Sequence, residues 1–256
     1  MARVLILLPD LDFDPTEAAV PWQVLTRRGH EVRFATPSGR MPAADPRMLH
    51  GTGLGPWKRL LMADANARSA YAKMTESEAF RSPLNHADVN ASEFDGLLLP
   101  GGHAKGMRPY LESATAQSIV AAAFARDIPV GAICHGVVLA ARAASADGRS
   151  VLHGRKTTGL TKPLELTGWA LTALWLGNYY RTYPETVEAE VRAALASPGD
   201  FLRGPMPLRR GDPAHLERGF TVRDGNYLSA RWPGDVHRFV SEYAAMLEET
   251  SERSAA

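Results

Sequence analysis

Residues 129–140 read PVGAICHGVVLA, an apolar run that passes through Cys134 and His135 into a second apolar run with helical spacing. This pattern is typical of a buried strand that bends sharply into a helix and presents a nucleophile at the bend. The bend needs small neighbours because the two backbones pass close together, and Ala132 and Gly136 supply them. The stretch therefore predicts a nucleophile elbow at Cys134.

Similar short apolar runs alternate with helical patterns along the rest of the chain. The strand candidates are residues 4–8, 31–35, 96–100 and 129–133. Helical patterns at 15–28 and 111–126 lie between them and predict two strand–helix–strand units. Such units give an α/β fold, a mostly parallel sheet with helices on both faces. A hairpin formed by residues 220–222 and 227–230 and a helix at 235–248 close the chain.

Two segments do not fit this rhythm and are expected to be insertions. They are residues 37–90, with a helix-compatible stretch at 57–80, and residues 177–212, with a short helix at 185–196. Because the carboxyl edge of a parallel sheet is where such folds bind ligands, we expect both insertions to cap a pocket there. No linker divides the chain convincingly, so residues 1–256 are predicted to form one domain.

The composition excludes several classes of protein. Hydrophobic residues make up 45% of the 256 residues and charged residues 22%, as in a globular protein. A net charge of +1 offers no broad surface for nucleic acid or an anionic membrane. No apolar run approaches the roughly 20 residues of a membrane-spanning helix, and the N-terminal run is too short for a signal peptide. With one cysteine and no internal disulfide, we expect a cytoplasmic protein.

Cys134 is the only cysteine, and its surroundings favour a reactive side chain. The start of a helix favours thiolate over thiol, so the sequence predicts a thiol pKa well below that of a free cysteine. The alternative is a buried structural cysteine. His135 follows directly. It is either a base near the sulfur or a histidine at the start of the helix whose ring donates a hydrogen bond to a loop carbonyl.

The segment LLLPGGH at residues 97–103 ends the preceding strand candidate with two glycines. Gly101 and Gly102 permit a backbone that approaches a ligand closely, and the amides of Gly102 and His135 could bind an oxyanion. Both glycines are therefore candidates for oxyanion or substrate binding. His103 either lines the site as well or is an ordinary polar loop residue.

Glu17 lies in the first turn of the helix that follows Asp14 and Pro15. A capping box explains it, with the carboxylate reaching back to the amide of Asp14. Alternatively, Glu17 faces Cys134 at the carboxyl edge of the sheet, where partial burial would raise its pKa and let it move protons.

Glu165, near the start of a helix at 163–176, is a candidate for the acid that orients His135 and completes a Cys-His-Glu set. An acid there also suits the helix dipole without any catalytic role. Asp147 and Asp235 compete for the same role, although each is as easily a turn or N-cap residue.

Patterns for bound cofactors are missing from the sequence. Metal-ligand spacings such as HxH, HExxH and CxxC do not occur, nor does a glycine-rich phosphate loop. We therefore predict neither a metal nor a cofactor. An aromatic-rich stretch at 169–183 is expected to pack in the core or the cap.

Several of these motifs together resemble the ThiJ/PfpI superfamily, which has a class I glutamine amidotransferase-like, flavodoxin-type fold. They are VLILLP at 4–9, Glu17, EFDGLLLPGGH at 93–103 and AICHG at 132–136. The resemblance covers about residues 3–170 and resumes at Phe220. It implies that Glu17 is the protonated carboxyl partner of Cys134.

Within this superfamily, the chain looks most like the branch of glutathione-independent glyoxalases and holding chaperones. The long first insertion, Thr158-Gly159 and the acid at Glu165 carry that resemblance. It implies a Cys-His-Glu/Asp triad, a homodimer, no cofactor, and a small carbonyl substrate, with methylglyoxal converted to lactate. A cysteine amidase or peptidase, and a stress-related holding chaperone with a redox-sensing cysteine, are the alternatives.

Overall fold

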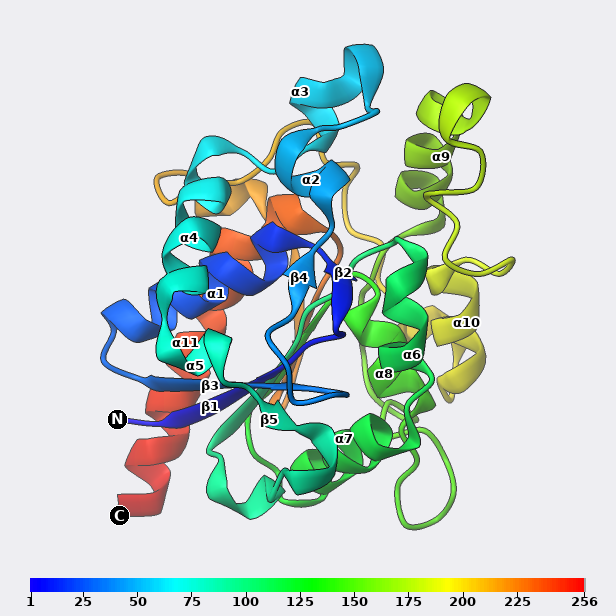
Figure 1. The fold of residues 1–256 in the computed structure, drawn as a ribbon. Coiled ribbons are helices and arrows are strands. Elements are labelled where there is room, and N and C mark those ends of the chain that lie inside the picture. The colour runs from blue at the N-terminus through cyan, green and yellow to red at the C-terminus, as the bar shows by residue number, and fades with distance from the viewer. Residues whose placement is uncertain (256) are drawn as a thin grey trace.

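The computed structural model describes residues 1–255, and the side chains of residues 1–253. Seven strands of this part of the chain form one sheet in the order β5-β3-β1-β6-β7-β9-β8 (Figure 1). The strands are β1 (Arg3–Leu7), β3 (Glu31–Thr36), β5 (Leu84–Asn85), β6 (Gly96–Leu99), β7 (Val130–Ile133), β8 (Thr221–Asp224) and β9 (Tyr227–Ala230). Neighbours are parallel except for the β8–β9 hairpin, which confirms the predicted flavodoxin-like α/β fold.

Helices cover both faces of the sheet, so the central strands are buried on both sides. One layer contains α1 (Pro15–Arg27), α4 (Ala65–Glu76), α5 (Glu78–Arg81) and α11 (Val236–Ala255). The other contains α6 (Arg108–Leu111), α7 (Ala114–Ala125), α8 (Gly136–Arg142) and α10 (Val187–Ala194). The side chains of residues 4–7 in β1 are at most 1% exposed, which explains why the strand reads as an uninterrupted apolar run.

The hairpin turns over two residues because Asp224 pairs directly with Tyr227. Gly225 has a φ of +60°, a conformation that glycine adopts without steric cost and that such turns require. The predicted hairpin is therefore confirmed.

The first insertion differs in detail from the single helix-compatible stretch expected at 57–80. It contains β4 (Ala43–Ala44), α2 (Pro46–His50), α3 (Lys58–Leu61), α4, α5 and β5. New helices begin where side chains cap them: Asp64 accepts a hydrogen bond from the amide of Ala67 (2.8 Å), and Ser77 accepts one from Phe80. β5 adds an edge strand to the main sheet, and β4 pairs with β2 (Leu11–Phe13) in a separate two-stranded sheet.

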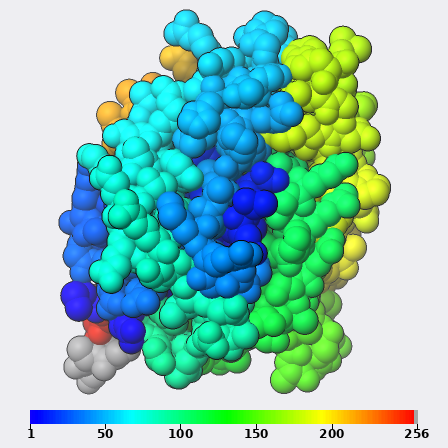
Figure 2. Space-filling view, viewed as in Figure 1, coloured from blue at the N-terminus to red at the C-terminus, as the bar shows by residue number. Residues whose placement is uncertain are grey.

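The first insertion meets α9 (Lys162–Leu176) and the start of the second insertion above the sheet. Figure 2 shows the α2–α3 segment beside α9 at the top of the molecule. Met48, Leu54 and Tyr180 form a small apolar cluster there, separate from the main core. The indole Nε1 of Trp175 also donates a hydrogen bond to the carbonyl of Gly53 (2.8 Å). We call this assembly of α2, α3 and α9 the cap. No helix in the described part of the chain is long and apolar enough to cross a membrane.

Candidate active site

Cys134 lies at the sharp bend between β7 and α8. Its φ is +57°, a strained value for a residue with a side chain, and its amide donates a hydrogen bond to the carbonyl of Ala230 (3.1 Å). A methyl group at Gly136 would overlap the carbonyl oxygen of Leu99, so glycine is required there. These features confirm the predicted elbow geometry.

Glu17 in α1 is 1% exposed and points to the same place. Its Oε2 accepts a hydrogen bond from the amide of Gly101 (2.8 Å), whereas the amide of Asp14 donates to the carbonyl of Gly101 (2.8 Å). The reciprocal bond of a capping box is thus not made, although Asp14 does cap α1 through the amides of Thr16 and Glu17. Oε1 of Glu17 has no nitrogen or oxygen partner among the described residues, and the Cys134 thiol acts on this carboxyl as a hydrogen-bond neighbour.

Burial acts on both members of this pair. It raises the pKa of Glu17 well above that of an ordinary carboxyl, and the nearby Asp14 charge adds to the effect. Both effects favour the protonated form of Glu17.

Burial also raises the pKa of the Cys134 thiol, and the charges of Glu17 and Asp14 add to this, while the amide of His135 acts in the opposite direction. The sequence-based expectation of a lowered thiol pKa is thus wrong for the resting protein. The expectation rested on the start of the helix, which lowers the pKa of a thiol, and left out the burial of the sulfur, which raises it more. When Glu17 carries its proton, its charge no longer opposes the thiolate, so the two groups are linked.

His135 is buried, and its ring lies between the sulfur and Thr182. Nδ1 is 3.6 Å from the sulfur of Cys134, and Nε2 is 3.0 Å from Oγ1 of Thr182. The Thr182 hydroxyl donates its single proton to the carbonyl of His103 (2.7 Å), so it must accept a hydrogen bond from Nε2–H. This fixes the tautomer: Nδ1 is unprotonated and faces the thiol. Burial, followed by the charges of His103 and Arg142, lowers the pKa of His135 to about 3, so the ring is neutral.

Glu165 occupies the first turn of α9 and lines the same cavity as Cys134. Its Oε2 accepts a hydrogen bond from the amide of Val187 (3.0 Å), and its Oε1 is 3.4 Å from the guanidinium of Arg181. Burial raises its pKa to about 7 in spite of these partners. The second ring nitrogen of His135 meets the hydroxyl of Thr182 and not Glu165. A role for Glu165 in orienting His135 stays a prediction.

The two competing acids lie elsewhere. Asp147 is exposed and accepts a hydrogen bond from Ser145 (2.6 Å), and Asp235 forms a buried ion pair with Arg231 (2.8 Å).

The cavity beside Cys134 has a volume of about 250 Å³. Its wall is mainly apolar, with Met48 and Leu60 from the first insertion, Leu164 from α9 and Met206 from the second insertion. The expectation that both insertions cap a pocket at the carboxyl edge of the sheet is therefore confirmed.

His103 lines the cavity, and its ring stacks on that of Tyr180 with centroids 4.3 Å apart. Burial lowers its pKa to about 4, and its Nε2 has no hydrogen-bond partner within the described chain. The amide of Gly101 is occupied by Glu17, so its part is to position that carboxyl. Oxyanion binding by the amides of Gly102 and His135 stays a prediction.

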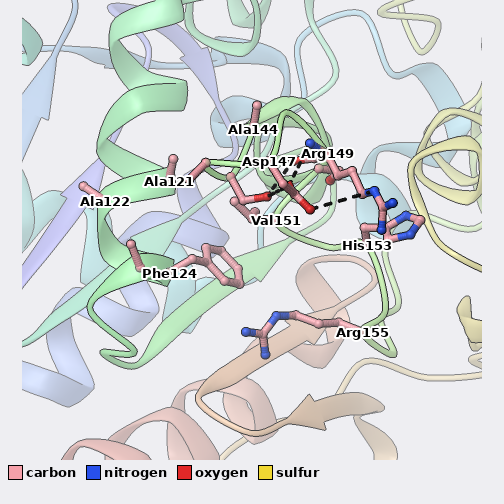
Figure 3. A pocket seen from close by; sticks show the side chains of 13 residues that line it. Ala121, Ala122, Phe124, Ala144, Asp147, Arg149, Val151, His153 and Arg155 are labelled. Carbon is pink, nitrogen blue, oxygen red and sulfur yellow. Dashed lines mark hydrogen bonds and ion pairs between the residues drawn. The ribbon is translucent and has the colours of Figure 1, made fainter.

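A larger hollow of about 510 Å³ lies elsewhere, between α7 and the segment 144–155. Figure 3 shows Asp147 and Arg149 close together on one side of it and Phe124 beside Arg155 on the other. None of the residues that line it belongs to the elbow. The smaller cavity is therefore the candidate active site. In the described part of the chain no three His, Cys, Asp or Glu side chains gather as metal ligands would.

Sequence reasoning missed four residues of this site. Thr182 orients His135, and Tyr180, Arg210 and Trp232 line the cavity. Tyr180 carried a signal, the aromatic-rich stretch, and it does pack in the cap as expected. Thr182 lies in the same stretch, but nothing there distinguishes its hydroxyl, and Arg210 and Trp232 lie where no local pattern marks a functional side chain.

A sequence profile described as ThiJ/PfpI family-like matches residues 8–191. The chain belongs to the ThiJ/PfpI family. The matched residues run from just after β1 into α10, and therefore include the elbow, Glu17 and Thr182.

Curated relatives differ in how much of their length the chain covers. It spans 44% of an uncharacterized protein of Schizosaccharomyces pombe, with 32% identity over 46% of this chain. It spans 62% of a glutathione-independent glyoxalase of the same organism, with 26% identity over 62% of this chain. A deglycase of Pyrococcus abyssi is 24% identical over 96% of this chain and 99% of its own length.

A solved structure named glyoxalase III, from Candida albicans, superimposes with a TM-score of 0.71. The match covers 96% of this chain and 97% of that one at 18% identity, so it shows a shared fold.

Proposed function

We propose that this protein is a cofactor-free enzyme in which Cys134 attacks small reactive carbonyl compounds, and that it converts methylglyoxal to lactate. The observation that carries the proposal is the pairing of two buried groups, one of which lines the cavity. The thiol of Cys134 lies at a strained elbow on the cavity wall, and the buried carboxyl of Glu17 is its hydrogen-bond neighbour. The relatives named glyoxalase and deglycase support an enzymatic role of this kind.

The first step is addition of the sulfur to the aldehyde carbon of methylglyoxal. The unprotonated Nδ1 of His135 takes the thiol proton, which ends on the aldehyde oxygen, and the product is a hemithioacetal. Nδ1 of His135 can take this role because it is unprotonated and faces the sulfur. Since burial lowers the pKa of this ring to about 3, the proton must pass on to the aldehyde oxygen in the same step, without a stable imidazolium.

The second step moves hydrogen between the two carbons. In its ionised form, Glu17 removes the proton from the former aldehyde carbon and delivers it to the adjacent carbon through an enediol, while the hydroxyl proton passes to the other oxygen. A carboxylate whose pKa is well above the ordinary value is a correspondingly stronger base. The resulting thioester is cleaved by water, which releases lactate and restores the thiol.

The test is to incubate the protein with methylglyoxal and follow lactate by NMR. Wild type should form lactate. Cys134→Ala should form none, and Arg149→Gln, at the remote hollow, should behave as wild type. Lactate formation that survives in Cys134→Ala would disprove the proposal.

The cysteine hydrolase and the holding chaperone stay predictions, and the same samples test them. Amide cleavage lost in Cys134→Ala, without lactate from wild type, would favour the hydrolase. Equal suppression of client aggregation by both proteins, without lactate, would favour the chaperone.

A further inference from the structure

The cavity of Cys134 carries hydrogen-bond donors that no acceptor in the protein meets. The hydroxyl of Tyr180, Nη1 of Arg210 and Nε1 of Trp232 are buried and have no partner among the described residues. All three residues line the cavity, and Tyr180 is only 7% exposed. Since buried donors are almost always satisfied, three of them at one cavity indicate that an acceptor comes from a ligand. We call these three residues the donor cluster.

Arg210 is held in place by contacts that leave its charge available. Its Nη2 donates to the carbonyls of Leu60 and Leu61, both at 3.2 Å, and its guanidinium lies over the ring of Trp232, 5.4 Å from the centroid. These partners are neutral groups. The side chain is thus ordered before any ligand arrives, which lowers the entropic cost of binding.

The acidic side chains of the same cavity are engaged elsewhere. Asp14 accepts hydrogen bonds from the amides of Thr16 (2.8 Å) and Glu17 (3.2 Å), and Glu165 is bound by Val187 and Arg181. The charge of Asp14 acts on Arg210 through space, without an ion pair between them. The cavity therefore holds three unmet donors, and both carboxyl groups that line it already accept hydrogen bonds from other parts of the protein.

We propose that the donor cluster binds a carboxylate of the substrate while Cys134 attacks its carbonyl carbon. The preferred substrates are then short aldehydes or 2-oxoaldehydes that also carry a carboxylate. This inference rests on the proposed function, since it extends the substrate of the same thiol. Arg210 is its main determinant because it supplies both a donor and a positive charge.

Alkylation of Cys134 by iodoacetate and by iodoacetamide tests the charge preference. The two reagents are similar in size and differ in charge, so the ratio of their rates is insensitive to changes in thiol ionisation or access. In Arg210→Gln the iodoacetate-to-iodoacetamide ratio should fall about 10-fold. Arg210→Lys should retain part of the preference for iodoacetate over iodoacetamide. Arg209→Gln, an exposed neighbour outside the cavity, should match wild type. An unchanged ratio in Arg210→Gln, or an equal fall in Arg209→Gln, would overturn the proposal.

A second measurement does not need a reactive thiol. In Cys134→Ser, lactate should raise the melting temperature more than lactamide, and this difference should vanish in Cys134→Ser/Arg210→Gln. If neither alkylating reagent labels wild type, the proposed function fails, and the melting shifts alone decide this inference. Equal shifts with lactate and lactamide would refute it.

Discussion

Thr182→Val tests whether the hydroxyl of Thr182 sets the protonation of His135. Valine keeps the shape of threonine but removes the hydroxyl that accepts a hydrogen bond from Nε2–H. The imidazole can avoid this loss by moving its proton to Nδ1, where it would face the sulfur of Cys134 and could no longer accept the thiol proton.

The size of the effect follows from the cost of a buried donor without a partner, about 1–3 kcal/mol. At about 1.36 kcal/mol for each tenfold change in rate, kcat/KM for methylglyoxal should fall by roughly 5- to 150-fold. Thr182→Ser keeps the hydroxyl and should recover most of the activity.

Lactate formation measured by NMR gives the rates, and the nitrogen chemical shifts of the His135 ring report which nitrogen carries the proton. Melting temperatures show whether each variant is folded. The reasoning is refuted if Thr182→Val turns over within about twofold of wild type, or if its ring keeps the Nε2–H form while activity is lost.

Three further changes have defined outcomes. Glu17→Gln should reduce lactate formation by about 10²–10⁴-fold, because the amide cannot carry a proton between carbons. Alkylation of Cys134 by iodoacetamide should not slow in this variant. If alkylation slowed as much as lactate formation, the role of Glu17 would be merely structural. Folded Glu165 keeps its proton up to about pH 7 whereas an ordinary carboxyl loses it near 4.5, so stability falls as the pH rises between these values. Glu165→Gln should lack this slope, worth about 3 kcal/mol at most, in urea unfolding at pH 5 and pH 8. Arg231→Met leaves a buried carboxylate unpaired and should cost about 3–5 kcal/mol, whereas Arg238→Met at an exposed pair should cost less than about 1 kcal/mol. Equal losses in the two variants would contradict that assignment.

The strands and the elbow could be predicted from the sequence because local patterns specify them. Residues 129–133 are apolar and flanked by small residues, and the structure begins β7 at Val130 and bends at Cys134. The hairpin carried its own signal in Gly225. In contrast, β5 consists of two residues and pairs only because the chain returns to the edge of β3, so no local periodicity marks it.

The site was predictable only in part, for the same reason. The family motifs placed Glu17 and Cys134 together, but the hydrogen bond of Thr182 to His135 spans 47 residues and comes from a loop. The direction of the thiol pKa shift also depends on tertiary burial, which outweighs the helix start that the sequence displays. Arg210 lies in a segment without regular structure, and only the folded chain brings it to the cavity.

The small cluster of Met48, Leu54 and Tyr180 packs the cap over Cys134 separately from the main core. The cap can therefore open locally while the strands beneath it stay folded. The free energy of this local opening, far smaller than that of global unfolding, then governs substrate entry and product release. Amide hydrogens of the cap will accordingly exchange with solvent sooner than those of the central strands.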